Sequence, residues 1–337
     1  MAGIAGLLKA EPEHFVVQEL PVQPPSGTGD HLWIEVEKRN LSTPQVIRSL
    51  AQLTGLATPT IGSAGRKDKR AVTRQWLSLV QDVHSKLPAD DQPVEVDDGY
   101  WQILRRASHG RRLRTGTLRG NRFEILLTAV APNSLARAQE LNAELQALGW
   151  MPNPFGPQRF NRPESLVRAR LLLARGHRGR NHRDRFDYSV LQAAFFNHYL
   201  NIRNWPEPLI VADEWYQTER GGMFTDSDEE SVSKRLKNLE ILPCGPLPGG
   251  KLRSPGAAAL RWMDEVGEIL GTGTEPWRGL GKKIPGTWRP MVIRAPAVEI
   301  AAEDRGLWLR FDLPAGSYAT VLLNYFQAGE WDLPCPV

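Results

Sequence analysis

Apolar and polar residues alternate along several short stretches of the chain, which is typical of β-strands that pack one face against a core. In His31–Arg39 the apolar residues at positions 32, 34 and 36 share one face, and Glu35 and Glu37 occupy the other. This pattern predicts a half-buried strand. Six further stretches are predicted to be strands because they are rich in β-branched and aromatic residues. They are Phe15–Leu20, Val72–Val80, Tyr100–Arg106, Arg122–Val130, Val298–Ala302 and Leu307–Phe311.

A helical period begins after Ser42, a residue type that caps helix N-termini, and Gly55 is placed to end that helix. Pro44 suits the first turn, where a backbone N–H has no partner in any case. A second helix is predicted from Asn133 to about Leu148. Further helices are expected over Leu166–Ala174 and Ser189–Arg203, after the acidic residues 226–230, and in a short stretch after Thr320.

Loops are expected where glycine, proline or acidic residues gather, at residues 86–99, 243–256 and 271–290. Residues 150–165, WMPNPFGPQRFNRPES, hold four prolines and mark a change of composition after Gly149. Strand patterns lie on both sides of a middle region that is helical and rich in loops. The sequence therefore predicts a sheet domain with an insertion.

The chain has 337 residues and a hydrophobic content of 41%, enough to build real cores. No apolar run reaches the length of a membrane-spanning helix, and the N-terminal residues lack the basic leader of a secretory signal. Cys244 and Cys335 are the only cysteines, which gives neither a disulfide framework nor a zinc spacing. We therefore expect a cytoplasmic protein.

The formal net charge of +4 favours an acidic partner only mildly, and the distribution of charge is more informative. Seven arginines fall in the eighteen-residue window 105–122, which contains no acid, and eight more lie within residues 162–185. Arginine binds phosphate through two hydrogen bonds and stacks on bases. Phe155, Phe160 and Phe186 lie beside the second cluster, and this mixture is typical of RNA recognition. A solvated face or intramolecular ion pairs would give the same charge pattern.

Residues 62–76, GSAGRKDKRAVTRQW, place a single carboxylate, Asp68, between Lys67 and Lys69 and two arginines. The four cations favour the ionised form of this carboxylate, and an ionised carboxylate is what nucleophilic catalysis requires. A loop braced by a following strand is also a common setting for site residues. The alternative is a solvated basic turn in which Asp68 only offsets repulsion among the cations.

Other kinds of site find little support in the sequence. The histidines show no metal-ligand spacing, and the chain has no phosphate-binding Walker loop, dinucleotide fingerprint or nucleophile elbow. We expect neither a metal nor a cofactor.

Five segments, in order along nearly the whole chain, resemble the motifs of the TruD family of tRNA pseudouridine synthases. They are residues 6–17 (GLLKAEPEHFVV), 64–75 (AGRKDKRAVTRQ), 118–123 (LRGNRF), 152–160 (PNPFGPQRF) and 313–320 (LPAGSYAT). Residues 205–290 carry no matching motif, and His14 stands where the family often has an acid.

The resemblance implies an α/β (α+β) fold, with a mostly antiparallel pseudouridine-synthase-type sheet, flanking helices and an inserted TruD-type second domain. The catalytic domain would comprise residues 1–148 and 292–337, and the inserted domain residues 149–291. The resemblance also implies a tRNA substrate whose uridine 13, in the D-arm, is isomerised to pseudouridine after the base has been flipped out. Nothing in the sequence demands a dimer, and we expect a monomer.

In this family an aspartate attacks the target nucleotide, and that role transfers to Asp68, with Lys9 as its basic partner. Four residues would bind the nucleotide by the same resemblance: Phe15, Asn121, Phe123 and Tyr318. Phe123 would stack on the uracil, although a phenylalanine at the start of a strand is more often a core residue. Contacts with the rest of the RNA would come from Arg66, Lys67, Arg111, Arg112, Arg114, Gln158, Arg159, Arg178 and Arg180.

Two other classes of protein share some of these features. A metal-dependent nuclease also uses carboxylates and lysines, but it needs further acids around its metal ion. A non-catalytic RNA-binding module explains the arginines but not the placement of Asp68.

Overall fold

The computed structural model describes residues 3–203, 215–254 and 256–337. Within these ranges the chain forms two compact units. The first unit contains residues up to Glu144 together with Pro296–Gly316 and Phe326–Ala328. The second contains Leu145–Ala295, Ser317–Tyr325 and the residues from Gly329 onward. The domain boundaries inferred from the family resemblance stay a prediction. None of the described helices is long and apolar enough to span a membrane.

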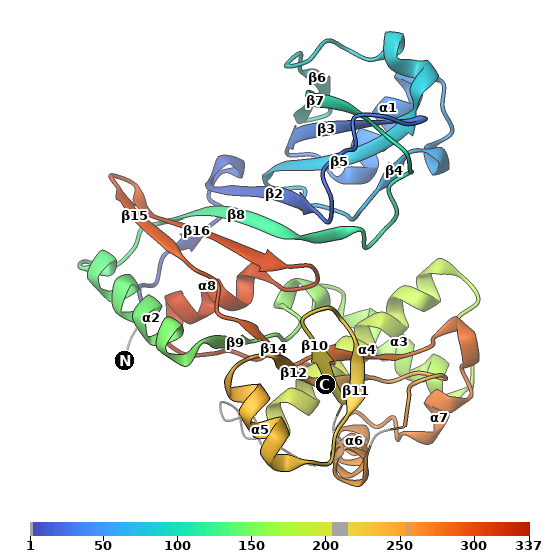
Figure 1. The fold of residues 1–337 in the computed structure, drawn as a ribbon, viewed down its shortest axis with the longest axis vertical. Coiled ribbons are helices and arrows are strands. Elements are labelled where there is room, and N and C mark those ends of the chain that lie inside the picture. Colours follow the sequence, from blue (N-terminus) through green and yellow to red (C-terminus); the bar gives the residue numbers. More distant parts are fainter. Residues whose placement is uncertain (1–2, 204–214, 255) are drawn as a thin grey trace. The chain divides into compact units, whose positions relative to one another are not determined.

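The first unit is built on a ten-stranded sheet in the order β15-β16-β8-β2-β5-β3-β7-β6, with β1 paired to β8 and β4 paired to β5 (Figure 1). Its strands are β1 (Leu7–Leu8), β2 (Phe15–Pro21), β3 (His31–Arg39), β4 (Gly62–Ser63), β5 (Val72–Val80), β6 (Val94–Val96), β7 (Gly99–His109), β8 (Leu118–Thr128), β15 (Glu299–Glu303) and β16 (Gly306–Pro314). Among these strands only β2 and β5 pair in parallel. The prediction of a mixed fold with a mostly antiparallel sheet is confirmed.

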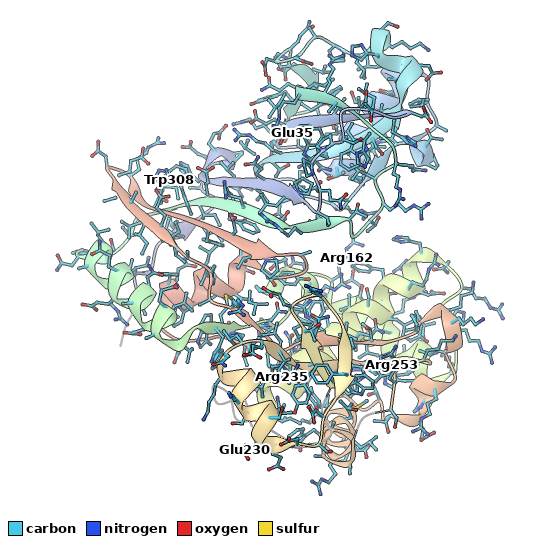
Figure 2. All side chains as sticks on the ribbon, in the orientation of Figure 1. Glu35, Arg162, Glu230, Arg235, Arg253 and Trp308 are labelled. Atoms are coloured by element: carbon cyan, nitrogen blue, oxygen red, sulfur yellow. The ribbon has the colours of Figure 1, made fainter. Side chains whose placement is uncertain are left out.

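Alternation along β3 defines the two faces of this sheet. Ile34 and Val36 are buried against helix α1 (Thr43–Thr54), which contributes Val46 and Leu50 to the same cluster. Because successive side chains of a strand point to opposite faces, Trp33 and Glu35 lie on the other side. Glu35 is labelled in Figure 2. That side is not open to solvent, since Glu35 is only 3% exposed. The prediction that β3 is half-buried is therefore wrong: both of its faces are covered.

Helix α1 begins and ends where its sequence indicates. The side-chain oxygen of Gln45 accepts the backbone N–H of Ser42 at 2.9 Å, which satisfies a donor that the helix leaves unpaired. Gly55 follows the last turn with a φ of 77°, a left-handed conformation that favours glycine. This capped helix fixes the position of the chain on both sides of it.

The second unit is mainly helical around α4 (His182–Ile202), whose apolar side chains are almost completely buried. Its other helices are α3 (Pro163–Ala174), α5 (Glu229–Lys237), α6 (Ala257–Ile269) and α7 (Glu275–Arg278). Its strands form one sheet, β11 (Met223–Thr225), β10 (Trp215–Thr218), β12 (Ile241–Leu247) and β13 (Thr287–Pro290), and one pair, β9 (Trp150–Pro152) and β14 (Val292–Arg294). Helices α2 (Ser134–Leu148) and α8 (Ala319–Ala328) each contribute residues to both units.

Short 3-10 turns complete the two units. They are Pro12–His14, Thr58–Thr60, Gln81–Lys86, Pro157–Phe160 and Gly281–Lys283.

Three of the expected loops contain regular structure. Strand β6 lies inside residues 86–99, β12 runs into residues 243–256, and α7 and β13 lie inside residues 271–290. Helix α6 has no counterpart among the predicted elements. These elements are short or contain prolines and glycines, so their local composition resembles that of loops.

Close packing of β8 against β16 requires a glycine at position 120. A Cβ atom added there would lie 2.2 Å from the carbonyl oxygen of Leu313, and backbone atoms cannot move aside as a flexible side chain can. We predict that Gly120→Ala lowers the free energy of unfolding by about 1–3 kcal/mol, the usual cost of overpacking. Urea unfolding would measure this change.

Gly110→Ala is the matched control, because a Cβ atom at Gly110 has no neighbour within 4 Å. It should shift the urea midpoint little. Equal stability of the Gly120→Ala variant and the wild type would contradict the close approach of these two strands.

Candidate functional site

The Asp68 carboxylate forms an ion pair with a lysine that is remote in sequence. Lys9 Nζ lies 3.3 Å from Asp68 Oδ2, and the same ammonium group lies 3.7 Å from the centre of the Phe15 ring. The Asp68 side chain is 50% exposed, so one side of its carboxylate is accessible to a substrate. The structure therefore brings together the predicted pair and one of the predicted nucleotide-binding residues.

The segment that carries Lys9 is held at the end of the first unit. Ile4 N–H donates to the carbonyl of Phe326 at 2.9 Å, and Ala5 N–H donates to that of Gln327 at 3.1 Å. Strand β1 then pairs with β8. Lys9 itself has a φ of 57°, a left-handed conformation that costs a non-glycine residue about 1–2 kcal/mol. The position of this ammonium group is thus fixed by its flanking contacts.

The cations next to Asp68 in sequence point to other partners. Lys67 Nζ lies 3.0 Å from Glu19 Oε2, and Lys69 Nζ lies 3.7 Å from Asp98 Oδ1. The Arg70 guanidinium donates to the carbonyl of Ala10 at 3.4 Å. The expectation that these neighbours surround the carboxylate is wrong in this respect, because successive side chains in the turn point in different directions. Lys9 supplies the positive charge instead.

Lys67 and Glu19 form an ion pair inside the first unit, with side chains only 6% and 1% exposed. Burial raises the pKa of Glu19, and the charge of Lys67 opposes that rise. Lys67 Nζ also donates to Asn121 Oδ1 at 2.8 Å. Lys67 was predicted to contact RNA, but its ammonium group is enclosed and paired. It joins the Asp68 loop to the strand that carries Asn121.

A second buried lysine, Lys38, holds the main chain of Asp68. Lys38 Nζ donates to the carbonyl of Asp68 at 2.7 Å and to that of Leu41 at 2.5 Å. Its side chain is completely buried under the loop, and burial lowers the pKa of Lys38 to about 8. This bond fixes the residue from its backbone side and leaves the carboxylate to Lys9.

Phe123 lies on β8 among other aromatic rings. Its centre is 6.3 Å from that of Phe15 in an edge-to-face arrangement and 5.5 Å from that of Phe311 in a stacked one. The ring is 7% exposed. Phe123 and Asn121 are two residues apart on β8, where they pair with Val17 and Glu19 of β2. The Phe123 ring and the Asn121 amide therefore lie on the same face of the sheet, the one on which Lys67 bonds to Asn121. A stacking role for Phe123 stays a prediction.

Tyr318 and the predicted RNA contacts Gln158 and Arg159 lie in the second unit. The Tyr318 ring is 5.8 Å from that of Phe155, and burial raises the pKa of its hydroxyl. Arg159 donates to Ser189 Oγ at 2.5 Å, and Gln158 accepts a hydrogen bond from Thr320 at 3.0 Å. Burial lowers the pKa of Arg159. Because Phe15 and Tyr318 belong to different units, their expected place in one pocket stays a prediction.

Arg289, which no motif indicated, completes this cluster of the second unit. Its guanidinium lies 4.4 Å from the centre of the Phe155 ring and donates to Asn153 Oδ1 at 2.9 Å. Burial lowers the pKa of Arg289 to about 10.

The first arginine cluster divides into two groups. Arg105, Arg106 and Arg122 form ion pairs with Glu35, Asp90 and Asp312, respectively. For these three arginines the explanation by intramolecular ion pairs is confirmed. Among the described residues no acid lies within ion-pair distance of the other four, Arg111, Arg112, Arg114 and Arg119. Arg66, Arg178 and Arg180 are likewise exposed.

Two further residues of the site could have been found from the alternation that identified their strands. Lys38 continues the apolar face of β3 by two positions, and Glu19 continues the buried face of β2 in the same way. A charged residue at such a position needs a buried partner. Within the described residues, no three His, Cys, Asp or Glu side chains are grouped so that they could hold a metal ion.

Comparison with known proteins gives one consistent result. The family model described as tRNA pseudouridine synthase D (TruD) matches residues 1–175 and 189–326. The tRNA pseudouridine synthase D of Anaeromyxobacter dehalogenans strain 2CP-1 is 36% identical, with 99% of this chain and 96% of that protein covered. The protein of the same name from a strain of Thermus thermophilus is also 36% identical, over 96% of this chain and 89% of that protein.

A solved structure shows the same fold. The crystal structure of a Methanosarcina mazei protein assigned as tRNA pseudouridine synthase D matches with a TM-score of 0.71 at 21% identity, and the match covers 96% of this chain and 94% of the other. The predicted family is confirmed by the extent of the family model and by the identity with curated relatives: this chain belongs to the TruD family of tRNA pseudouridine synthases.

Proposed function

We propose that this chain isomerises uridine 13 in the D-arm of tRNA to pseudouridine, with Asp68 as the nucleophile. Family membership supports the reaction class. The observation that carries the assignment to Asp68 is its ion pair with Lys9, because it places an ammonium group against a half-exposed carboxylate beside the Phe15 ring. Both residues lie within segments that resemble the motifs of the family.

The chemistry asks little of the protein beyond charge and position. The bond between uracil N1 and the ribose C1′ breaks, the base turns, and a new bond forms between C5 and C1′. The proton on C5 is lost and N1 gains one, so the atoms of substrate and product balance without an oxidant or a reductant. A fixed carboxylate lowers the barrier of such a reaction by attacking the nucleotide within the site.

Three contacts fix Asp68 for this attack. Lys9 holds the carboxylate, Lys38 holds the carbonyl of the same residue, and Lys67 ties the loop to β8. Lys38 and Lys67 are positioning residues in this proposal, because their ammonium groups bond to the protein and not to the carboxylate. Loss of either would let the loop shift.

The base must leave the stack of its helix to reach Asp68. Phe15 and Phe123 would contact the flipped uracil, Asn121 would hydrogen-bond to it, and Tyr318 would complete the pocket. Stacking on one aromatic ring typically contributes about 1–3 kcal/mol, which offsets the cost of unstacking. A monomer that acts on tRNA in the cytoplasm fits this proposal.

Asp68→Asn is the direct test of the nucleophile. The amide keeps the shape of the side chain but cannot attack the nucleotide, so we expect no pseudouridine to form while the Kd for tRNA changes by less than about threefold. Chemical mapping of pseudouridine and a filter-binding assay would measure the two quantities.

Asp98→Asn is the matched control, since Asp98 is an exposed acid that pairs with Lys69, the residue after Asp68. It should retain activity. Normal pseudouridine formation by Asp68→Asn would refute the assignment, and activity in excess EDTA would exclude the nuclease interpretation of the motif.

Lys38→Met tests the positioning role. The variant keeps a long side chain but loses the donor to the Asp68 carbonyl, and we expect the rate at saturating tRNA to fall about 10- to 100-fold with little change in KM. Lys86→Met is the control, because Lys86 also donates to a backbone carbonyl, that of Thr54 at the end of α1, and makes no bond to the Asp68 loop. Equal rates for Lys38→Met and the wild type would contradict the role.

The pH dependence of stability gives an independent check on Lys38. Its pKa is about 8 in the folded chain against 10.5 when unperturbed, so between these values the unfolded state binds more protons than the folded state. Stability rises with pH wherever the unfolded state binds more protons. The free energy of unfolding of the wild type should therefore rise relative to that of Lys38→Met from about pH 8 to 10.5. Urea unfolding over this interval measures the difference, which would stay constant if burial did not lower the pKa of Lys38.

A further inference from the structure

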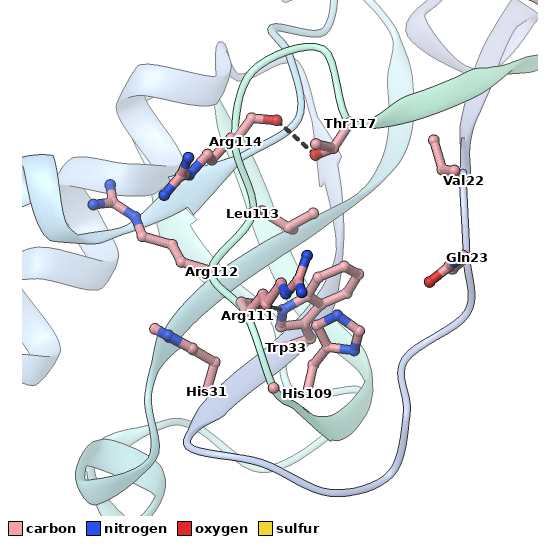
Figure 3. A pocket seen from close by; sticks show the side chains of 11 residues that line it. Val22, Gln23, His31, Trp33, His109, Arg111, Arg112, Leu113, Arg114 and Thr117 are labelled. Atoms are coloured by element: carbon pink, nitrogen blue, oxygen red, sulfur yellow. Dashed lines mark hydrogen bonds between the residues drawn. The ribbon is translucent and has the colours of Figure 1, made fainter.

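A cavity of about 710 Å³ lies in the first unit, beside the loop that joins β7 to β8 (Figure 3). Trp33, His31 and His109 form part of its lining, and Arg111 and Arg114 project from the loop. Figure 3 shows Arg111 beside Trp33 and His109, with the segment that carries Gln23 on the other side of the cavity.

The positive charge of the residues that line this cavity is not balanced by acidic residues in the lining. Its lining contains three arginines and two histidines but no aspartate or glutamate. Within the described residues, no acid is paired with Arg111 or Arg114, whereas Arg105 and Arg122 of the same sequence window are both in ion pairs. An exposed arginine without an acid is available to an external anion, and its planar guanidinium suits phosphate.

The loop that presents these arginines is fixed by internal hydrogen bonds. Trp33 Nε1 donates to the carbonyl of Arg111 at 2.8 Å, and Leu113 N–H donates to Ser78 Oγ at 2.9 Å. Arg112 donates to the carbonyl of Pro59, which gives this arginine an anchoring role in the loop. A rigid loop loses little conformational freedom when it binds a ligand, so its arginines bind phosphate more tightly than mobile ones would.

Aromatic rings form the floor of the cavity. The rings of Trp33 and His109 lie 4.2 Å apart, centre to centre. The backbone N–H of Ser26 donates to His109 Nδ1 at 3.1 Å, so the other ring nitrogen is the one that can donate into the cavity. An imidazole donor beside guanidinium groups fits the phosphate oxygens and ribose hydroxyls of an RNA backbone.

This cavity and Asp68 lie on opposite faces of the sheet. Lys38, which bonds to Asp68, occupies an even position on β3, whereas His31 and Trp33 occupy odd positions. The loops that carry the two sites are nevertheless connected, because Gly116 N–H donates to the carbonyl of Ala64, four residues before Asp68, at 2.8 Å. A large folded RNA can contact both faces of the sheet.

We propose that this cavity binds backbone phosphates of the substrate RNA that are remote from the target nucleotide. The proposal rests on the proposed function and extends it: the sheet face that carries Asp68 holds the base, and the opposite face holds another part of the same RNA. Contacts of this kind set affinity and orientation and leave the chemical step unchanged.

The double variant Arg111→Ala/Arg114→Ala tests the proposal, with Arg48→Ala/Arg305→Ala as the control. Both variants lose two exposed arginines of the first unit, so the net charge changes equally. The Kd for full-length tRNA is measured over a range of salt concentrations. We expect the first variant to bind at least tenfold more weakly at low salt. A plot of the logarithm of the association constant against the logarithm of the salt concentration has a negative slope. The magnitude of this slope should be smaller by about 1.4–1.8 in the first variant, which corresponds to the loss of two phosphate contacts. The control should keep the wild-type slope.

Two kinetic measurements separate this role from catalysis. At saturating tRNA the single-turnover rate of the first variant should equal that of the wild type. With a short hairpin that carries only the target stem and loop, kcat/KM should be the same for both proteins, because that RNA does not reach the opposite face.

Unchanged affinity and slope, or an equal loss of affinity for the short hairpin, would overturn the proposal. A wild type that forms no pseudouridine would overturn the proposed function instead. The difference in salt slope between the variants would then still report an RNA-binding cavity.

Discussion

Two lysines with almost completely buried side chains, Lys38 and Lys67, hold the loop on which the proposed chemistry depends. Lys38 bonds to the carbonyl of Asp68, and Lys67 bonds to Glu19 and Asn121. Burying a charged amine is costly unless its donors are paired, and both of these amines are paired. Both ammonium groups bond elsewhere, so within the part of the chain that the structure describes the Asp68 carboxylate pairs with Lys9, and its side chain stays half exposed.

Positive charge in this chain therefore serves three separate purposes. Buried lysines fix the loop, and arginines such as Arg105 neutralise acids on the covered face of β3. The third group consists of exposed cations without an acidic partner among the described residues, including Arg111 and Arg114. Net charge and local charge density do not distinguish the three, since they differ only in what each side chain meets in the folded chain. The same distinction explains why a basic sequence window is a weak indicator of a nucleic-acid site by itself.

Much of the first unit could be predicted from local patterns. Strands β3 and β5 and helix α1 begin and end within a residue of the predicted positions, because alternation, caps and turn residues act over a few neighbours. The pairing of Asp68 with Lys9 followed from the family resemblance, since a contact between residues 59 positions apart leaves no local pattern. Lys67 was assigned to RNA contacts for the same reason, because its partner Glu19 lies on β2, remote in sequence. Lys38 was within reach of sequence reasoning, because its position on the apolar face of β3 demanded a partner.

The backbone contacts of the N-terminal segment have a consequence for synthesis. Ile4 and Ala5 bond to Phe326 and Gln327, and these bonds position the chain that leads to Lys9. During translation, residues 4 and 5 emerge from the ribosome long before residue 326 is made. The bonds that position Lys9, the ammonium partner of Asp68, therefore form only after residues 326 and 327 have been made. In the proposed mechanism, activity then arises only once nearly the whole chain has been synthesised.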